Sequence, residues 1–227
     1  MPRSAPAVTV DATAAPAVRA AAPLPEAQVG FFNQKGTTLT AATGTVESPH
    51  PGRAPDFHLQ NLEDCTVALC ETFGALKMEH LRNCTILCGP VQGSVYVESC
   101  HDCTIVVASR QIRIHNSVGC DFYVCTASGP IIEDCSGTRF APYVFRYPAL
   151  DKHMSEANLQ TASTAWSDVK DFKWLRAQQS PNWCVLPLRE ALRTIPSPLA
   201  ACAKTLELSV DVLDDGAGAG DDDDEEL

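Results

Sequence analysis

The chain has 227 residues, a length that suits one globular domain with extensions. Its net charge of −11 is concentrated at one end, because residues 211–227 hold seven Asp and two Glu without any Lys or Arg, which leaves −2 for the rest. A body so close to neutral argues against nucleic-acid binding, which needs a basic face. No apolar run is long enough to cross a bilayer and no secretory signal opens the chain, so we expect no membrane insertion and expect the eleven cysteines to be reduced thiols.

The two ends differ in composition from the middle. Residues 1–28 are rich in Ala and Pro and cannot bury a core, which predicts a disordered arm. The acidic stretch 211–227 predicts a disordered tail. We therefore expect one domain over residues 29–190, followed by a C-terminal extension over 191–210.

A repeat of 17 to 20 residues runs through the middle of the chain. Its markers are four cysteines in similar contexts, spaced by 19, 19 and 17 residues: Cys65, Cys84, Cys103 and Cys120. Between them lie short apolar pieces separated by Gly, Ser, Asn or Asp, too short for helices. Units of this length cannot bury a face alone and must stack. The sequence predicts an all-β fold, a three-sided parallel β-helix whose coils lie roughly 4.8 Å apart.

The coil model gives the cysteines a packing role. Small apolar thiols at one coil position would form an inward ladder. Cys100 and Cys103 have CxxC spacing, but no second CxxC or HxxxH accompanies them. We therefore expect neither a zinc site nor a redox pair.

Residues 110–115 carry the pattern with the most chemistry. Ile112 and Ile114 alternate with Gln111, Arg113 and His115, which predicts a half-buried strand with an amide, a guanidinium and an imidazole on its outer side. Arg110 adds a second cation just before it. By itself the pattern also fits a surface strand with solvated charges.

The repeat ends after Glu133, and four crowded aromatic residues follow. We expect them to cap the open end of the coil stack: Phe140, Tyr143, Phe145 and Tyr147.

A C-terminal helical segment is predicted to pack on the β-helix. Within residues 154–178, Val169, Phe172 and Leu175 have the spacing of one helix face that begins at Ser167 and Asp168. Three tryptophans should anchor this segment, with packing favoured for the first and third: Trp166, Trp174 and Trp183. A short helix is expected over Leu188–Ile195.

Several separated motifs, in order, resemble the C-terminal domain of the tubulin-binding cofactor C family. The retinitis pigmentosa 2 protein shares this domain, and cyclase-associated proteins are more distant. The resemblance covers roughly residues 29–187. The motifs are Gln111–His115, Ile131–Gly137, Phe140–Tyr143, Asp171–Trp174 and Ser180–Trp183.

The resemblance implies a right-handed parallel β-helix and GTPase activation in trans. By motif position, Arg113 matches the family's arginine finger and Glu133 the glutamate that orients it, while Phe172 matches an interface aromatic. Arg110, Gln111 and His115 become flanking partner contacts. The resemblance implies that the protein acts on GTP-bound β-tubulin together with tubulin cofactors D and E. The implied location is the cytoplasm or cytoskeleton.

Glu133 follows Arg113 by 20 residues, about one coil. If both point outward, they stack on adjacent rungs within reach of a charge-assisted pair. A register slip of one residue would turn Glu133 inward.

The chain contains neither a GxxxxGK[ST] motif nor a Gly-rich strand-to-helix loop, so we expect no nucleotide site and no cofactor of its own. Two alternatives stay open. The partner could instead be an Arf-like small GTPase at a basal body or cilium. The domain could also be a non-catalytic cytoskeletal scaffold. About 28 Ala/Pro-rich residues stand where cofactor C carries a spectrin-like domain, which weakens the tubulin assignment but not the GTPase-activating one.

Overall fold

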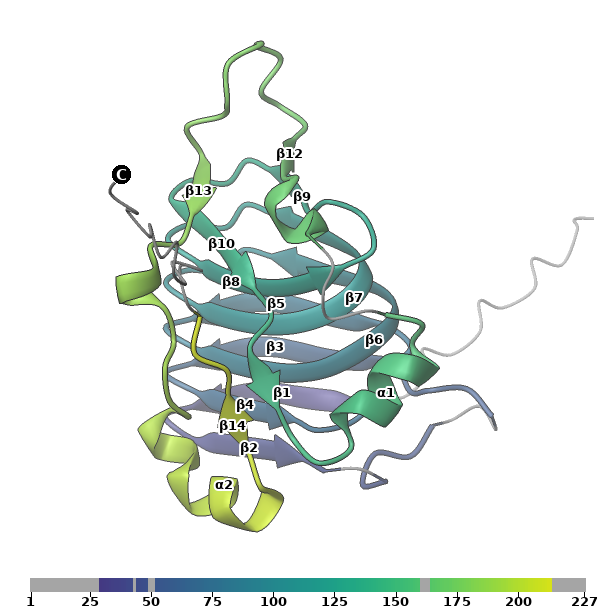
Figure 1. Ribbon diagram of the computed structural model, residues 1–227. Helices are drawn as coiled ribbons and strands as arrows, with labels where there is room; N and C mark the ends of the chain where they lie inside the picture. Colours follow the sequence, from purple (N-terminus) through teal and green to yellow (C-terminus); the bar gives the residue numbers. More distant parts are fainter. Residues whose placement is uncertain (1–28, 43, 49–51, 160–163, 214–227) are drawn as a thin grey trace, which may run out of the picture.

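The computed structural model describes residues 29–42, 44–48, 52–159 and 164–213. The predicted arm and residues 214–227 of the predicted tail lie outside these residues. The described part is a stack of parallel strands wound into a β-helix (Figure 1), as predicted. Within it, no helix has the length and apolar character needed to cross a membrane.

Two sides of the β-helix matter for function, and we call them face A and face B. Face A consists of β1 (Gly30–Lys35), β3 (Phe57–Glu63), β5 (Leu76–Arg82), the later parts of β6 (Thr85–Glu98) and β7 (Thr104–His115), β9 (Ile131–Glu133) and β12 (Lys170–Asp171). Face B consists of β2 (Thr38–Ala41), β4 (Thr66–Leu69), the earlier parts of β6 and β7, β8 (Asp121–Thr126), β10 (Thr138–Pro142) and β13 (Trp183–Val185).

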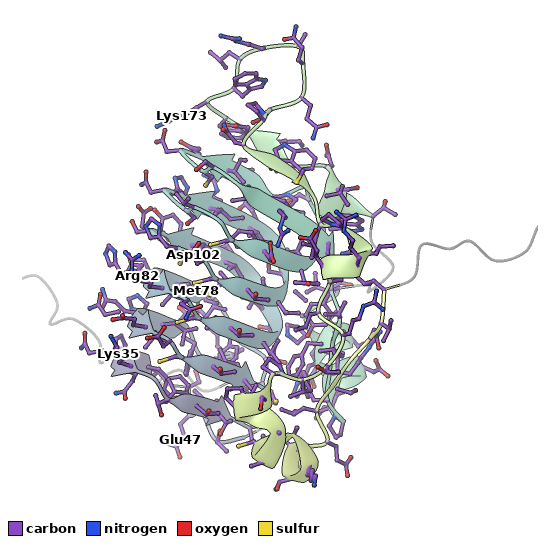
Figure 2. The ribbon with its side chains drawn as sticks, turned by 90° about the vertical axis from the view of Figure 1, so that its left-hand side faces the viewer. Lys35, Glu47, Met78, Arg82, Asp102 and Lys173 are labelled. Carbon is purple, nitrogen blue, oxygen red and sulfur yellow. The ribbon has the colours of Figure 1, made fainter. Side chains whose placement is uncertain are left out.

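The corner that follows face A explains many of the Asn and Asp residues between the apolar pieces. The register aligns six residues with positive φ there: Asn33, Asn61, His80, Ser99, Asn116 and Asp134. Asn and Asp tolerate this left-handed conformation better than other side chains. Figure 2 shows Lys35, Arg82 and Asp102 along this edge of the stack.

The cysteine ladder lies inside the β-helix, as predicted. Cys65, Cys84, Cys103 and Cys120 occupy one coil position and are at most 2% exposed. Each thiol donates to the carbonyl two residues before it, as in Cys84 Sγ to Arg82 O at 3.2 Å. None of the eleven cysteines forms a disulfide, and nine of them are buried, where their thiols act as small packing groups.

The outer side of face B is covered by the C-terminal part of the chain. Its outward residues are apolar and buried: Ala68, Leu87, Val106, Tyr123 and Ala141. They pack against β11 (Phe145–Arg146), α1 (Leu150–Glu156), η2 (Leu188–Glu190), η3 (Ser197–Leu199), α2 (Ala200–Leu206) and β14 (Ser209–Val210). The molecule thus has a second core outside the coil, and face B is not available to a partner.

The predicted aromatic cap is mostly wrong. Phe140 lies inside the last coil, stacked on Phe122 with ring centroids 5.3 Å apart. Tyr143, Phe145 and Tyr147 instead belong to the second core, because the chain turns back along face B after β10. The interior cluster is covered by Trp166 of η1 (Ala165–Ser167) and by Trp183, which confirms their packing roles.

The helix predicted to begin at Ser167 and Asp168 and to carry Val169, Phe172 and Leu175 on one face is also wrong. Helix α1 ends at Glu156, and Lys170–Asp171 forms strand β12 instead. The last coil offers free ladder groups, and Lys170 N donates to Pro130 O at 2.8 Å. Three apolar residues at helical spacing do not outweigh this pairing, and Leu175 is 92% exposed.

Two further C-terminal expectations need correction. The helix expected over Leu188–Ile195 is a single 3-10 turn, η2, and α2 was not predicted. Asp211, placed at the start of the predicted tail, follows β14 and pairs with Arg146 at 2.6 Å.

Candidate functional site

Face A presents two outward ladders in which all side chains but Ile131 are polar. The register aligns one ladder as His58, Lys77, Tyr96, Arg113, Ile131 and Lys170. It aligns the neighbouring ladder as Gln60, Glu79, Glu98, His115 and Glu133. Unlike the outward ladder of face B, these two ladders carry a charged residue in every coil from β5 onward, and the C-terminal part of the chain that covers face B leaves Arg113 exposed.

Arg113 points outward from the middle of face A. Its neighbours Ile112 and Ile114 are fully buried, while Arg113 is exposed, as the alternation predicts. Its backbone lies between Tyr96 and Ile131 in the sheet. Among the described residues, its guanidinium has neither an ion pair nor a hydrogen bond. The structure therefore holds this arginine on a rigid strand and leaves its charge free.

Glu133 also points outward, but it does not stack on Arg113. The register places Ile131 beside Arg113 and His115 beside Glu133, because this coil spans 18 residues and not 20. The direct stacking predicted from the sequence is therefore wrong. The two residues lie on a diagonal, with Cα atoms roughly 8 Å apart from the strand spacing and rise. No ion pair of Glu133 occurs within the described residues, so its carboxylate is free to meet an arginine.

The other two carboxylates of this ladder are already engaged. Glu98 accepts hydrogen bonds from Tyr96 Oη at 2.7 Å, Asn116 Nδ2 at 2.6 Å and Ser99 Oγ at 3.3 Å. Burial pushes the pKa of Glu98 up, but these hydrogen bonds outweigh it and lower the pKa below its usual value. The hydrogen bond to Glu98 raises the pKa of Tyr96 to about 12.

Glu79 is engaged in the same way by cationic and ring nitrogens. Lys77 Nζ and His58 Nε2 each lie 2.8 Å from its carboxylate. Glu133 is thus the carboxylate of this ladder that the described residues leave without such partners.

The predicted flanking contacts fall on or beside face A. Gln111 and His115 are half-buried and flank Arg113 on the same side of β7. The His115 ring packs on Tyr96, with centroids 5.1 Å apart. Arg110 is exposed at the corner before the strand, where its carbonyl accepts a hydrogen bond from Ser128 Oγ at 3.3 Å.

Phe172 extends face A by one further rung. Its N–H donates to Ile132 O at 3.1 Å, which places it beside Glu133 in the ladder. Its side chain is 51% exposed. The structure therefore gathers Arg113, Glu133, His115 and Phe172 on one surface.

The loop after Phe172 projects beyond the last coil (Figure 1), and Lys173 marks its start in Figure 2. Asp171 holds its base by accepting hydrogen bonds from Ser180 Oγ at 2.6 Å, Asn182 Nδ2 at 2.7 Å and Lys173 N at 3.1 Å. Lys173 also pairs with Asp134 of the coil. The position of Phe172 is thus fixed on both sides.

Sequence reasoning missed Tyr96, Asn116 and Asp171. The first two could have been found from the repeat. Residues Val95–Glu98 correspond to Ile112–His115 one coil earlier, and the alternation of the strand predicts that Tyr96 points outward. The role of Asp171 had no local signal, because its partners come from the far end of a loop.

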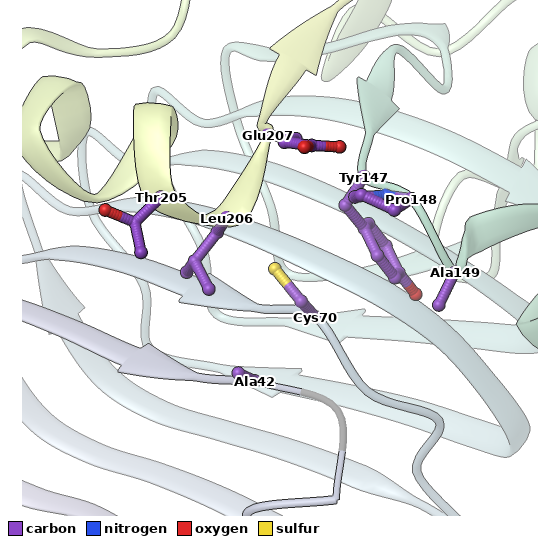
Figure 3. Close-up of a pocket in the computed structure, with 8 residues that line it drawn as sticks. All are labelled: Ala42, Cys70, Tyr147, Pro148, Ala149, Thr205, Leu206 and Glu207. Carbon is purple, nitrogen blue, oxygen red and sulfur yellow. The ribbon is translucent and has the colours of Figure 1, made fainter.

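Arg113 does not line the hollows of about 360 and 330 Å³ that the described residues form. A hollow of about 360 Å³ lies on the other side of the molecule, lined by residues such as Cys70, Tyr147 and Leu206 (Figure 3). In the described residues, no group of His, Cys, Asp or Glu side chains could hold a metal ion. An exposed cation beside a free carboxylate and an exposed aromatic ring suits contact with another macromolecule.

Comparison with known proteins shows the family to which the chain is similar. Residues 54–172 match the family model described as tubulin binding cofactor C. Tubulin-folding cofactor C of Arabidopsis thaliana is 42% identical over 161 residues, covering 71% of this chain and 45% of that protein. Tubulin-specific chaperone C of Mus musculus is 38% identical over 189 residues, covering 80% and 55%. Protein XRP2 of Gallus gallus is 36% identical over 166 residues, covering 72% and 46%.

The chain spans about half the length of these curated relatives. The family model covers more than half of the chain, including β3 to β12 and therefore Arg113 and Glu133. The chain belongs to the tubulin binding cofactor C family.

Proposed function

We propose that this protein activates GTP hydrolysis on β-tubulin by inserting Arg113 into the partner's nucleotide site, as part of the tubulin folding pathway. The observation that carries the proposal is the outward guanidinium of Arg113. It is exposed on the open face of the β-helix and has no partner among the described residues. An arginine that the described residues leave unpaired is available to complete another protein's site.

The chemistry accounts for the residue type. GTP hydrolysis builds negative charge on the oxygens of the γ-phosphoryl group, and a planar guanidinium donates to two of them at once without losing its charge. Such an arginine accelerates hydrolysis roughly 10³–10⁵-fold, which is about 4–7 kcal/mol of barrier.

The surroundings of Arg113 support this role. Glu133 lies diagonally ahead of it and can hold the long side chain in one rotamer before the partner arrives. Phe172 provides an exposed apolar contact on the same surface. Gln111, His115 and Arg110 complete the contact region.

The names of the relatives favour tubulin as the partner. Tubulin-folding cofactor C and tubulin-specific chaperone C are 37–42% identical to this chain over 144–189 residues in Arabidopsis thaliana, Mus musculus and Homo sapiens. The similarity to Protein XRP2 gives the second candidate, activation of an Arf-like small GTPase.

Single-turnover GTP hydrolysis tests the proposal. The full chain is added to αβ-tubulin with tubulin cofactors D and E, and separately to Arf-like GTPases. We expect stimulation with tubulin and loss of at least a thousandfold of it in Arg113→Ala. Stimulation of Arf-like GTPases alone would reassign the partner. A lack of stimulation in both assays, with binding retained, would favour a non-catalytic scaffold, and full activity of Arg113→Ala would refute the finger.

A further inference from the structure

Glu98 is placed where it could capture the catalytic arginine. It follows Tyr96 by two residues in β6, and Tyr96 stands beside Arg113 in the sheet. Glu98 lies one coil before Arg113 and Glu133 lies one coil after it, and each is displaced from Arg113 by two residues along the strand. The two carboxylates therefore lie in similar diagonal positions on opposite sides of Arg113. A guanidinium has no electrostatic reason to prefer Glu133 unless Glu98 is unavailable.

The structure makes Glu98 less available by engaging both of its carboxylate oxygens with neutral donors. Tyr96 Oη and Asn116 Nδ2 bind its carboxylate at 2.7 and 2.6 Å, and Ser99 Oγ adds a third hydrogen bond at 3.3 Å. The Tyr96 ring is itself fixed, between the His115 ring at 5.1 Å and Lys77 Nζ at 5.9 Å from its centroid. These contacts hold the hydroxyl on Glu98 before any partner binds.

We propose that Tyr96 and Asn116 are positioning residues that mask Glu98, so that Arg113 stays free to turn toward Glu133 and the partner's nucleotide. This inference rests on the proposed function and adds to it the device that keeps the arginine from pairing backward. Removing either donor exposes a carboxylate oxygen of Glu98. Arg113 then forms an ordinary surface ion pair with Glu98, and the fraction of molecules with an unpaired Arg113 falls.

Tyr96→Phe is the first test because it keeps the ring and removes only the hydroxyl. An exposed or half-exposed ion pair is weak, so we expect the stimulated single-turnover rate to fall roughly two- to fivefold. Asn116→Gly should have an effect of the same size, since glycine accepts the positive φ of this position. Asn83→Gly is the matched control: Asn83 also has positive φ and binds a carboxylate, Asp64 Oδ1 at 2.7 Å, but lies two coils away from Arg113.

Rescue distinguishes masking from a general loss of structure. In Tyr96→Phe combined with Glu98→Gln, the charge that would capture Arg113 on the Glu98 side is gone while Glu133 remains, so the rate should return to that of the unchanged protein. The loss in Tyr96→Phe should also shrink at high salt, which screens an exposed pair. A double variant no faster than Tyr96→Phe, or full rates in both Tyr96→Phe and Asn116→Gly, would overturn the masking.

A readout without GTPase separates this inference from the proposed function. In Tyr96→Phe, the Arg113 side-chain NεH resonance should shift and sharpen on pairing with Glu98, and Glu98→Gln should reverse the change. If Arg113→Ala keeps full stimulation, the proposed function fails whatever the spectra show. If Arg113→Ala is inactive but Tyr96→Phe shows neither the rate loss nor the spectral change, only the masking fails.

Discussion

Replacing Asp171 by Asn should loosen the loop that carries Phe172 while leaving the β-helix folded. The carboxylate accepts hydrogen bonds from Ser180 Oγ, Asn182 Nδ2 and Lys173 N at 2.6, 2.7 and 3.1 Å. Each hydrogen bond to a charged group contributes about 1.5–3 kcal/mol when measured alone. The three share one half-buried carboxylate and are not additive. An amide keeps one acceptor oxygen, so we expect Asp171→Asn to destabilise the closed loop by about 2 kcal/mol.

Native-state hydrogen exchange measures this change directly. The N–H of Phe172 is protected by its bond to Ile132 O, and 2 kcal/mol corresponds to roughly 30-fold faster exchange. Amides in the coil interior, such as Ile105, should not change. Asp168→Asn is the control, because Asp168 is exposed and forms only a long ion pair, with its carboxylate 3.7 Å from Lys170 Nζ. We call the three hydrogen bonds to Asp171 the clamp. Unchanged protection of the Phe172 N–H in Asp171→Asn would show that this clamp does not hold the loop.

The pH dependence of the clamp has a definite sign. Burial pushes the pKa of Asp171 up, but the hydrogen bonds from Ser180, Asn182 and the loop backbone outweigh it and lower the pKa. A carboxylate with a lowered folded-state pKa stabilises the fold above its unfolded value, about 3.9, and this contribution disappears as pH falls through the folded-state value. The difference in loop protection between the unchanged protein and Asp171→Asn should therefore be full at pH 7 and vanish in strong acid.

Four further predictions concern activity, partner binding, thiols and the core. Arg113→Lys should be nearly as inactive as Arg113→Ala in single-turnover hydrolysis, because an ammonium lacks the planar fork; a rate near that of the unchanged protein would contradict a bidentate role. Phe172→Ala should raise the half-saturating partner concentration about tenfold and keep the saturating rate, and the reverse pattern would argue against a docking role. A thiol reagent should modify the exposed Cys184 first and the buried cysteines only on unfolding, since burial raises the pKa of Cys125 to about 11; rapid reaction of more than two thiols in folded protein would contradict the ladder. Phe140→Ala should lower the free energy of unfolding by about 3–5 kcal/mol in urea titrations, because the ring is fully buried against Phe122; a loss below 1 kcal/mol would show that this end of the core is loosely packed.

Much of the architecture follows from the sequence alone. The cysteine spacing fixes the coil length closely enough to predict stacked parallel strands, and the thiols occupy the inward position that it predicts. The alternation in Gln111–His115 predicts which side chains face out, because a strand has a strict two-residue period. The motifs that carry the family resemblance also lie in the sequence.

Only the tertiary structure decided which side chains of neighbouring coils lie side by side. The coil between Arg113 and Glu133 is two residues shorter than their separation, so Glu133 came to lie beside His115, and corner lengths cannot be read from local spacing. The segment around Phe172 became a strand and a clamped loop because the last coil offered unpaired backbone groups to it. The C-terminal segment covers face B and not face A, a long-range choice driven by the burial of the apolar outer ladder of face B.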